Sequence, residues 1–141
     1  MIGRWVYSAR EKVLYAMYGN DNSGQMLYRI DHINETAEIA MTFAYGRHGA
    51  PPVIGDTGTY IYMPPSQSTN QLERCNTVTD ALETLAAPTT GTFSHSAWKN
   101  DKLWITLDDN LYSYDPATNS WSAALHNFGD LAKSFSLRTK Q

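Results

Sequence analysis

Apolar residues in this chain fall in short runs separated by clusters of Gly, Pro, Asn, Asp and Ser. The runs are rich in aromatic and β-branched residues and recur about every ten residues, which is typical of an antiparallel β-meander. No segment requires a helix. The pattern predicts three units of four strands each, at residues 5–7, 13–17, 26–30 and 37–39, then 53–54, 60–63, 72–75 and 81–85, and finally 93–98, 103–107, 111–114 and 121–125.

The third strand of each unit carries a repeated sequence. Residues 27–31 (Leu-Tyr-Arg-Ile-Asp) and 72–76 (Leu-Glu-Arg-Cys-Asn) match residues 111–115 (Leu-Tyr-Ser-Tyr-Asp). The leading leucines are 45 and then 39 residues apart. A spacing of about 40 to 50 residues is expected when each repeat is one four-stranded propeller blade.

The turn after the repeated strand has its own signature. Asp31, Asn76 and Asp115 occupy equivalent places, and a side-chain oxygen at this place can accept backbone N–H bonds just beyond it and close a hairpin. Soon after each turn comes an apolar residue that we expect to pack toward the neighbouring unit. These residues are Ala37, Leu82 and Trp121.

Residues 114–121, Tyr-Asp-Pro-Ala-Thr-Asn-Ser-Trp, closely resemble the kelch motif. The glycine pair that precedes this motif in kelch blades is absent. The resemblance implies an all-β fold of kelch-like blades at about residues 3–41, 49–86 and 91–125, with residues 126–141 as the incomplete first strand of a further blade. A β-sandwich or an open meander of similar strand content is the alternative fold.

Three blades pose a closure problem, because propellers contain about four to eight blades around their axis. Either the chain is part of a longer propeller, or another subunit completes the partial propeller. Two copies arranged head to tail would form a six-bladed ring. In the tail, residues 134–139 resemble the opening of a first strand, so we expect Phe135 and Leu137 to dock on a neighbouring subunit. The alternative is a frayed terminus.

The composition of the chain excludes several classes of protein. The 141 residues are 42% hydrophobic, and the formal net charge of -3 gives no basic footprint for nucleic acid. One cysteine excludes an intrachain disulfide, and no apolar run reaches the roughly 18 residues of a membrane span. The first residues lack the apolar core of a secretory signal. A cytoplasmic chain is therefore the default expectation, although a mature fragment of a larger protein would look the same.

No residue pattern indicates catalysis, a metal or another cofactor. The four histidines show no metal-ligand spacing. Ser94 and His95 are adjacent on a predicted strand and would point to opposite faces, which is evidence against a catalytic dyad. Asp108 and Asp109 could supply oxygen ligands to calcium, but such a pair is more often just a turn. Cys75 falls on a packed strand and is interpreted as an inert buried thiol.

The chain is therefore interpreted as a non-enzymatic structural or protein-interaction module that assembles with itself or within a larger complex, as a scaffold or virion component would. Loops on a β-scaffold usually carry recognition, and the densest group of contact-prone residues is Phe43, Tyr45, Arg47 and His48. Packing of Phe43 and Tyr45 at the crossover between units is the alternative.

A carbohydrate-binding module is the second hypothesis, in which one tryptophan is a stacking platform for a sugar. The four candidates are Trp5, Trp98, Trp104 and Trp121. The last three fall on predicted strands and should be mostly buried, whereas a lectin needs an exposed tryptophan. An enzyme ranks third, because no acid, base and nucleophile can be placed together.

Overall fold

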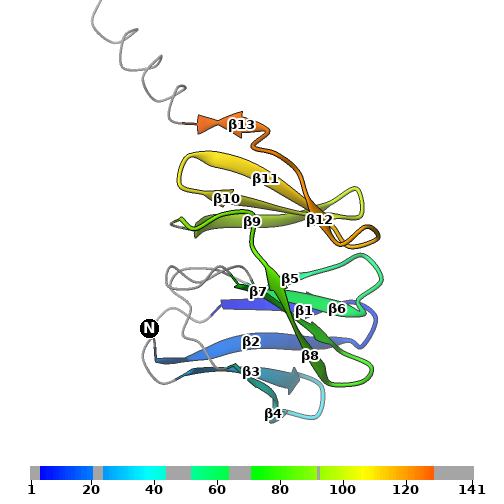
Figure 1. The fold of residues 1–141 in the computed structure, drawn as a ribbon. Coiled ribbons are helices and arrows are strands. Elements are labelled where there is room, and N and C mark those ends of the chain that lie inside the picture. Colours follow the sequence, from blue (N-terminus) through cyan, green and yellow to red (C-terminus); the bar gives the residue numbers. More distant parts are fainter. Residues whose placement is uncertain (1–3, 21–23, 44–51, 64–70, 92, 129–141) are drawn as a thin grey trace, which may run out of the picture.

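The computed structural model describes residues 4–20, 24–43, 52–63, 71–91 and 93–128, and it consists of three antiparallel sheets (Figure 1). In each sheet the four main strands follow one another in chain order. The strands are β1 (Arg4–Ser8), β2 (Val13–Asn20), β3 (Gly24–Asp31) and β4 (Thr36–Phe43) in the first sheet, β5 (Val53–Ile54), β6 (Tyr60–Met63), β7 (Gln71–Asn76) and β8 (Ala81–Ala86) in the second, and β9 (Phe93–Lys99), β10 (Lys102–Leu107), β11 (Asn110–Asp115), β12 (Ser120–Trp121) and β13 (His126–Asn127) in the third. The predicted all-β class is confirmed.

The fourth strand of the third sheet is interrupted, so the prediction of one strand over residues 121–125 is wrong. β12 and β13 both pair with β11, and the residues between them leave the regular ladder. The Ser122 N–H still donates to the Ser113 carbonyl, and the Leu125 N–H donates to the Leu111 carbonyl. In addition, the Ser122 hydroxyl accepts a bond from the Ser113 N–H, replacing a ladder carbonyl. The segment therefore follows β11 without strand geometry.

The predicted turn chemistry is present in all three sheets. After each third strand, a side-chain oxygen accepts the backbone N–H two residues further on at 2.9 Å, in the pairs Asp31–Ile33, Asn76–Val78 and Asp115–Ala117. Each turn then contains one residue with positive φ, at Glu35, Asp80 and Asn119. The same local hydrogen bond thus reverses the chain at the same place in each repeat.

The sheets stack face to face with their first strands side by side. β1 contacts β5, and β5 contacts β9. Apolar side chains fill the space between the first and second sheets in a first core, which contains Val13, Tyr15, Met17, Leu27, Met41, Phe43, Ile61, Met63 and Cys75. A second core lies between the second and third sheets and contains Val53, Tyr62, Leu72, Leu103, Ile105, Leu107 and Tyr114. Stacked sheets with adjacent first strands are the arrangement of propeller blades.

Of the three residues expected to pack toward a neighbouring unit, Trp121 does so. Its indole N–H donates to the Ala86 carbonyl of the second sheet at 2.7 Å, and its ring lies 5.1 Å from that of Tyr114. The prediction is wrong for Leu82, and no described sheet packs on Ala37. Leu82 is 39% exposed because it lies on the outermost strand, β8, which contributes no residue to the first core. Ala37 is exposed on a side of the first sheet that no described sheet covers.

We predict that Trp121→Ala lowers the free energy of unfolding by about 3 kcal/mol, because it removes a large aromatic ring and leaves the Ala86 carbonyl without its donor. Trp121→Phe keeps the ring packing and should cost about 1 kcal/mol. Urea denaturation measures both values. Val78→Ala, at an exposed turn position, is the control with little expected change. Equal midpoints for all four proteins would contradict the inter-sheet role of Trp121.

Candidate functional site

One side of the first sheet is apolar, and no described sheet covers it. Side chains alternate between the two faces of a strand, and directly paired residues share a face. The strand registers therefore place one set of residues on the side opposite the first core. This set, called here the open face, consists of Trp5, Tyr7, Leu14, Ala16, Tyr18, Met26, Tyr28, Ile30, Ala37, Ile39 and the polar Thr42.

The open face carries no charged residue and is substantially exposed. Trp5 is 63% exposed and Ile39 is 54% exposed. Tyr18 and Tyr28 contact each other edge to face, with their ring centroids 6.2 Å apart. Large contiguous apolar patches are rare on monomeric soluble proteins, and they mark interaction surfaces.

The same side of the other two sheets is buried. Leu14, Ile61 and Leu103 are equivalent, because each pairs with the fourth residue of the repeated motif in its own sheet. Ile61 and Leu103 are fully buried against the preceding sheet. The open face therefore has the strand register and the apolar character of an inter-sheet interface, but no described sheet packs on it.

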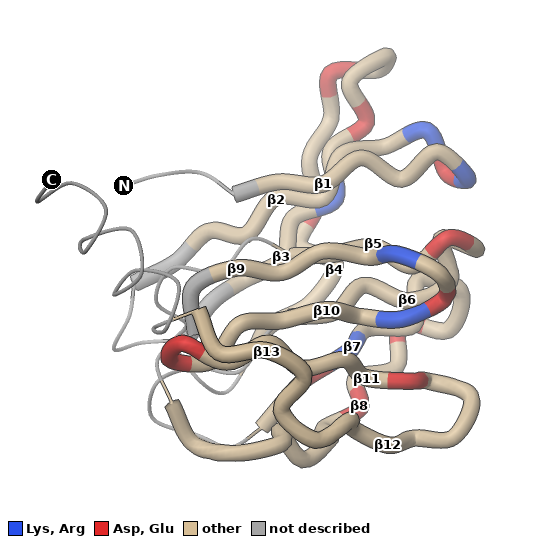
Figure 2. The backbone as a smooth tube through the Cα atoms, turned by 90° about the horizontal axis from the view of Figure 1, so that it is seen from above, with Lys and Arg blue, Asp and Glu red and all other residues tan. Residues whose placement is uncertain are grey.

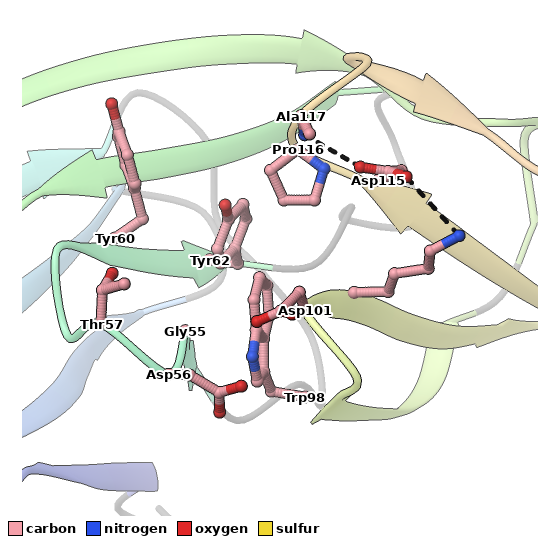
Figure 3. A pocket seen from close by; sticks show the side chains of 11 residues that line it. Gly55, Asp56, Thr57, Tyr60, Tyr62, Trp98, Asp101, Asp115, Pro116 and Ala117 are labelled. Carbon is pink, nitrogen blue, oxygen red and sulfur yellow. Dashed lines mark hydrogen bonds and ion pairs between the residues drawn. The ribbon is translucent and has the colours of Figure 1, made fainter.

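A second candidate site is a pocket of about 380 Å³ between the second and third sheets (Figure 3). Aromatic side chains from both sheets form part of its wall. Three carboxylates and a proline also line it, and Asp56, Asp101 and the adjacent Asp115 and Pro116 come from three segments far apart in sequence. The lining residues are Gly55, Asp56, Thr57, Tyr60, Tyr62, Trp98, Asp101, Lys102, Asp115, Pro116 and Ala117.

The aromatic wall of the pocket is held by contacts among its rings and with a neighbouring guanidinium. Trp98 stacks on Tyr62 with ring centroids 5.4 Å apart and an angle of 22° between the planes. The Arg74 guanidinium lies 4.4 Å from the centroid of the Tyr60 ring, and it also pairs with Glu83 at 2.6 Å. Burial raises the pKa of Tyr62 to about 12. This phenol is therefore neutral at physiological pH.

The rim of the pocket is acidic. Lys102 pairs with Asp115 at 3.5 Å, which partly neutralises one carboxylate. Asp56 and Asp101 are exposed, and Figure 3 shows both carboxylates beside Trp98. More widely, Figure 2 shows charged residues gathered at the end of the sheets that bears the pocket turns. The pocket thus combines hydrogen-bond acceptors with an aromatic wall.

The Cys75 thiol is buried in the first core and forms no disulfide, which agrees with the interpretation from the sequence. Burial raises its pKa to about 11, and the nearby charges of Asp80 and Glu11 add to this effect. The described residues contain no group of three or more His, Cys, Asp and Glu side chains suited to a metal ion. They also contain no helix long and apolar enough to cross a membrane.

The predicted partner-binding residues are only partly described. Phe43 is 1% exposed and lies in the first core, where it packs between the first two sheets. Tyr45, Arg47, His48, Phe135 and Leu137, together with the predicted tail strand at 134–139, lie outside the described residues. The predicted contact cluster therefore stays a prediction.

Sequence reasoning missed both the open face and the pocket. The open face alternates in the same way as the core strands, so it carries no distinct signal. For the pocket, Trp98 was considered only as a stacking platform. Nothing in the sequence indicates that Asp56, Asp101 and Pro116 converge on it, because two different sheets bring them together.

No protein-family model matches the chain, and no curated protein matches it. Solved structures do. A chain of the nidogen/laminin complex matches with a TM-score of 0.71 and 12% identity, over 89% of this chain and 47% of the other. TolB from Acinetobacter baumannii matches with a TM-score of 0.66 and 17% identity, over 84% of this chain and 31% of the other.

These likenesses establish the β-propeller fold, since both of the similar structures are propellers. The three sheets form a partial propeller and span less than half of either similar chain. At such low identity the likeness shows the fold alone, and it does not distinguish kelch repeats from other propeller repeats.

We predict that Cys75 reacts with a thiol reagent at pH 8 at least about a hundredfold more slowly in the native protein than in 6 M guanidinium, because burial disfavours the thiolate. The folded pKa is raised above the unfolded value, so the thiol's contribution to stability is present below about pH 9 and is lost as the pH rises toward 11. Reaction rates measured across this range test the claim, and equal native and denatured rates at pH 8 would contradict it.

Proposed function

We propose that this chain is a non-enzymatic protein-interaction module that self-associates through the open face of its first sheet, so that a second copy covers that face. The observation that carries the proposal is the register equivalence between Leu14, which is only partly buried and which no described sheet covers, and the fully buried Ile61 and Leu103. In the second and third sheets this side packs on a preceding sheet. The first sheet carries the same kind of surface and leaves it open.

The energetics favour covering this surface. Burial of apolar area contributes about 25 cal/mol per Å², and aromatic residues dominate the energetics of many interfaces. The open face offers four aromatic side chains, Trp5, Tyr7, Tyr18 and Tyr28, without a charge that would have to lose its hydration. The nidogen/laminin structure is a complex, and it supports an interaction role by fold analogy alone.

The double variant Trp5→Glu/Ile39→Glu tests the proposal. Both side chains are exposed, so the change should spare the fold while placing two carboxylates in the contact surface. We expect the wild-type chain to associate in sedimentation velocity experiments and the variant to remain monomeric at the same concentrations. Val78→Glu is the matched control, because Val78 is a similarly exposed apolar residue outside the open face. A wild type that stays monomeric up to millimolar concentration, or a variant that associates like the wild type, would overturn the proposal.

A second function, saccharide binding, is favoured by the pocket between the second and third sheets. Its carboxylates can accept hydrogen bonds from sugar hydroxyls, and its aromatic wall offers apolar contact to a sugar ring. A volume of about 380 Å³ is within the range of small-molecule sites. Trp98, Trp104 and Trp121 are all partly buried, and Trp98 is the one that lines this pocket.

Saturation-transfer NMR with a panel of neutral mono- and disaccharides tests the pocket. We expect at least one sugar to bind, and Asp56→Asn/Asp101→Asn to weaken its binding by at least about tenfold through loss of charge-assisted hydrogen bonds. Asp109→Asn alters an exposed carboxylate in a turn outside the pocket and should leave binding unchanged. The saccharide function is refuted if no sugar binds or if the double variant binds as tightly as the wild type.

A further inference from the structure

We infer that two copies of the chain close head to tail into a ring of six sheets, in which the open face of each copy packs on the outer face of the other copy's third sheet. This inference rests on the proposed function and adds the surface that meets the open face. The outer face is the side of the third sheet turned away from the second core. The registers of β9, β10 and β11 place Ala97, Trp104, Thr106, Leu111 and Ser113 on it, and they place the charged Lys99, Lys102 and Asp115 at one end of it.

Two residues of this outer face match core residues in the other sheets. Trp104 is equivalent to Tyr15 and Tyr62. Each of the three comes directly after the residue of its strand that pairs with the fourth residue of the repeated motif. Tyr15 and Tyr62 are fully buried against the next sheet, whereas Trp104 is only partly buried. All three are aromatic residues. The third sheet therefore presents an aromatic residue at the position that packs on a following sheet.

The first leucine of the repeated motif, on the neighbouring strand, is also buried in the first two sheets and partly exposed in the third. Leu27 and Leu72, which begin the first two copies of the motif, are fully buried in the first and second cores. Leu111, which begins the third copy, is partly exposed. Among the described residues, the third sheet therefore presents a leucine and an aromatic ring at positions that pack on a following sheet in the first two sheets.

The two uncovered surfaces are complementary in kind. At the junction between the first and second sheets, the side of the first sheet that corresponds to the outer face packs on the side of the second sheet that corresponds to the open face. Joining the outer face of one copy to the open face of another repeats this existing junction. By contrast, pairing two open faces with each other would leave Trp104 and Leu111 uncovered on both copies. The head-to-tail arrangement therefore covers both surfaces at once.

The number of copies follows from the number of sheets. Propellers close with about four to eight blades. The described part of the chain contains three sheets, so two copies supply six of them and three copies would supply nine. Two copies are consequently the closed assembly that fits the range. Closure also leaves no unpartnered face on which further copies could add.

The equivalence also predicts a specific contact across the new junction. Val6 of β1 and Ile54 of β5 both pack against the first core. By register, Ala97 is the counterpart of Val6, and Tyr7 is the counterpart of Ile54. Ala97 of one copy should therefore lie close to Tyr7 of the other copy.

A mixing experiment tests the ring. Ala97 is exposed on the outer face, and we expect Ala97→Glu alone to prevent assembly, as we expect of Trp5→Glu/Ile39→Glu. An equimolar mixture of these two variants can form one unmodified junction per pair. The mixture should therefore form a dimer of one chain of each variant, with a Kd at least about tenfold lower than that of either variant alone. Ala81→Glu, at an exposed strand position outside both faces, is the control that keeps full association, and far-UV circular dichroism checks that each variant is folded.

The outcomes separate the ring from the proposed function. If Ala97→Glu associates like the wild type while the open-face variant is monomeric, the ring is wrong and the open faces pair with each other. A mixture without recovery, or an assembly of more than two copies, also overturns the ring. If both variants associate like the wild type, the ring and the proposed function are both wrong. Oxidation of a mixture of Tyr7→Cys and Ala97→Cys chains should give a mixed disulfide dimer in the ring and none if the ring is wrong.

Discussion

Burial of one apolar sheet face against another is the interaction on which the rest of this structure depends. Because side chains alternate along a strand, each sheet has two sides, and most strands here carry apolar residues on both. The second sheet shows the consequence most clearly, since Ile61 points into the first core while the adjacent Tyr62 points into the second. A sheet with two apolar sides buries both of them only when it lies between two others. The described sheets cover one side of the first sheet and one side of the third, and they leave the other side of each uncovered.

Local chemistry explains why the fold could be predicted in outline. The turn after each third strand depends on one side-chain oxygen and the backbone just beyond it, so Asp31 and Asn76 could be placed without any tertiary information. The repeat spacing then predicted three four-stranded sheets. Trp121 was a stronger signal than Ala37 or Leu82, because an indole can reach the neighbouring sheet and donate a hydrogen bond to it. The shorter side chains at the equivalent positions do not.

The candidate sites could not be predicted, because their character depends on which sheets become neighbours. Leu14 and Ile61 occupy equivalent positions in strands of similar composition, and only the order of stacking leaves one uncovered and buries the other. The pocket is a still clearer case. Asp56, Trp98 and Pro116 come from three separate turns and strands, and their proximity results from the packing of the second sheet on the third. The alternation of side chains along a strand predicts on which face of its sheet a residue lies. It does not predict whether another sheet packs on that face.

The two ends of the stack differ in a way that bears on how they are covered. The open face is broad and aromatic, whereas the outer face of the third sheet contains Ser113, Thr106 and the charged Lys99, Lys102 and Asp115 beside Trp104 and Leu111. An assembly that joined two open faces would bury the more apolar pair of surfaces, so area alone would favour it. The register of the existing junctions favours the opposite arrangement, because Trp104 and Leu111 stand where Tyr15 and Leu27 already pack on a following sheet. In a propeller the angle and spacing between sheets must repeat for the ring to close, and this requirement gives the head-to-tail junction its advantage over simple apolar association.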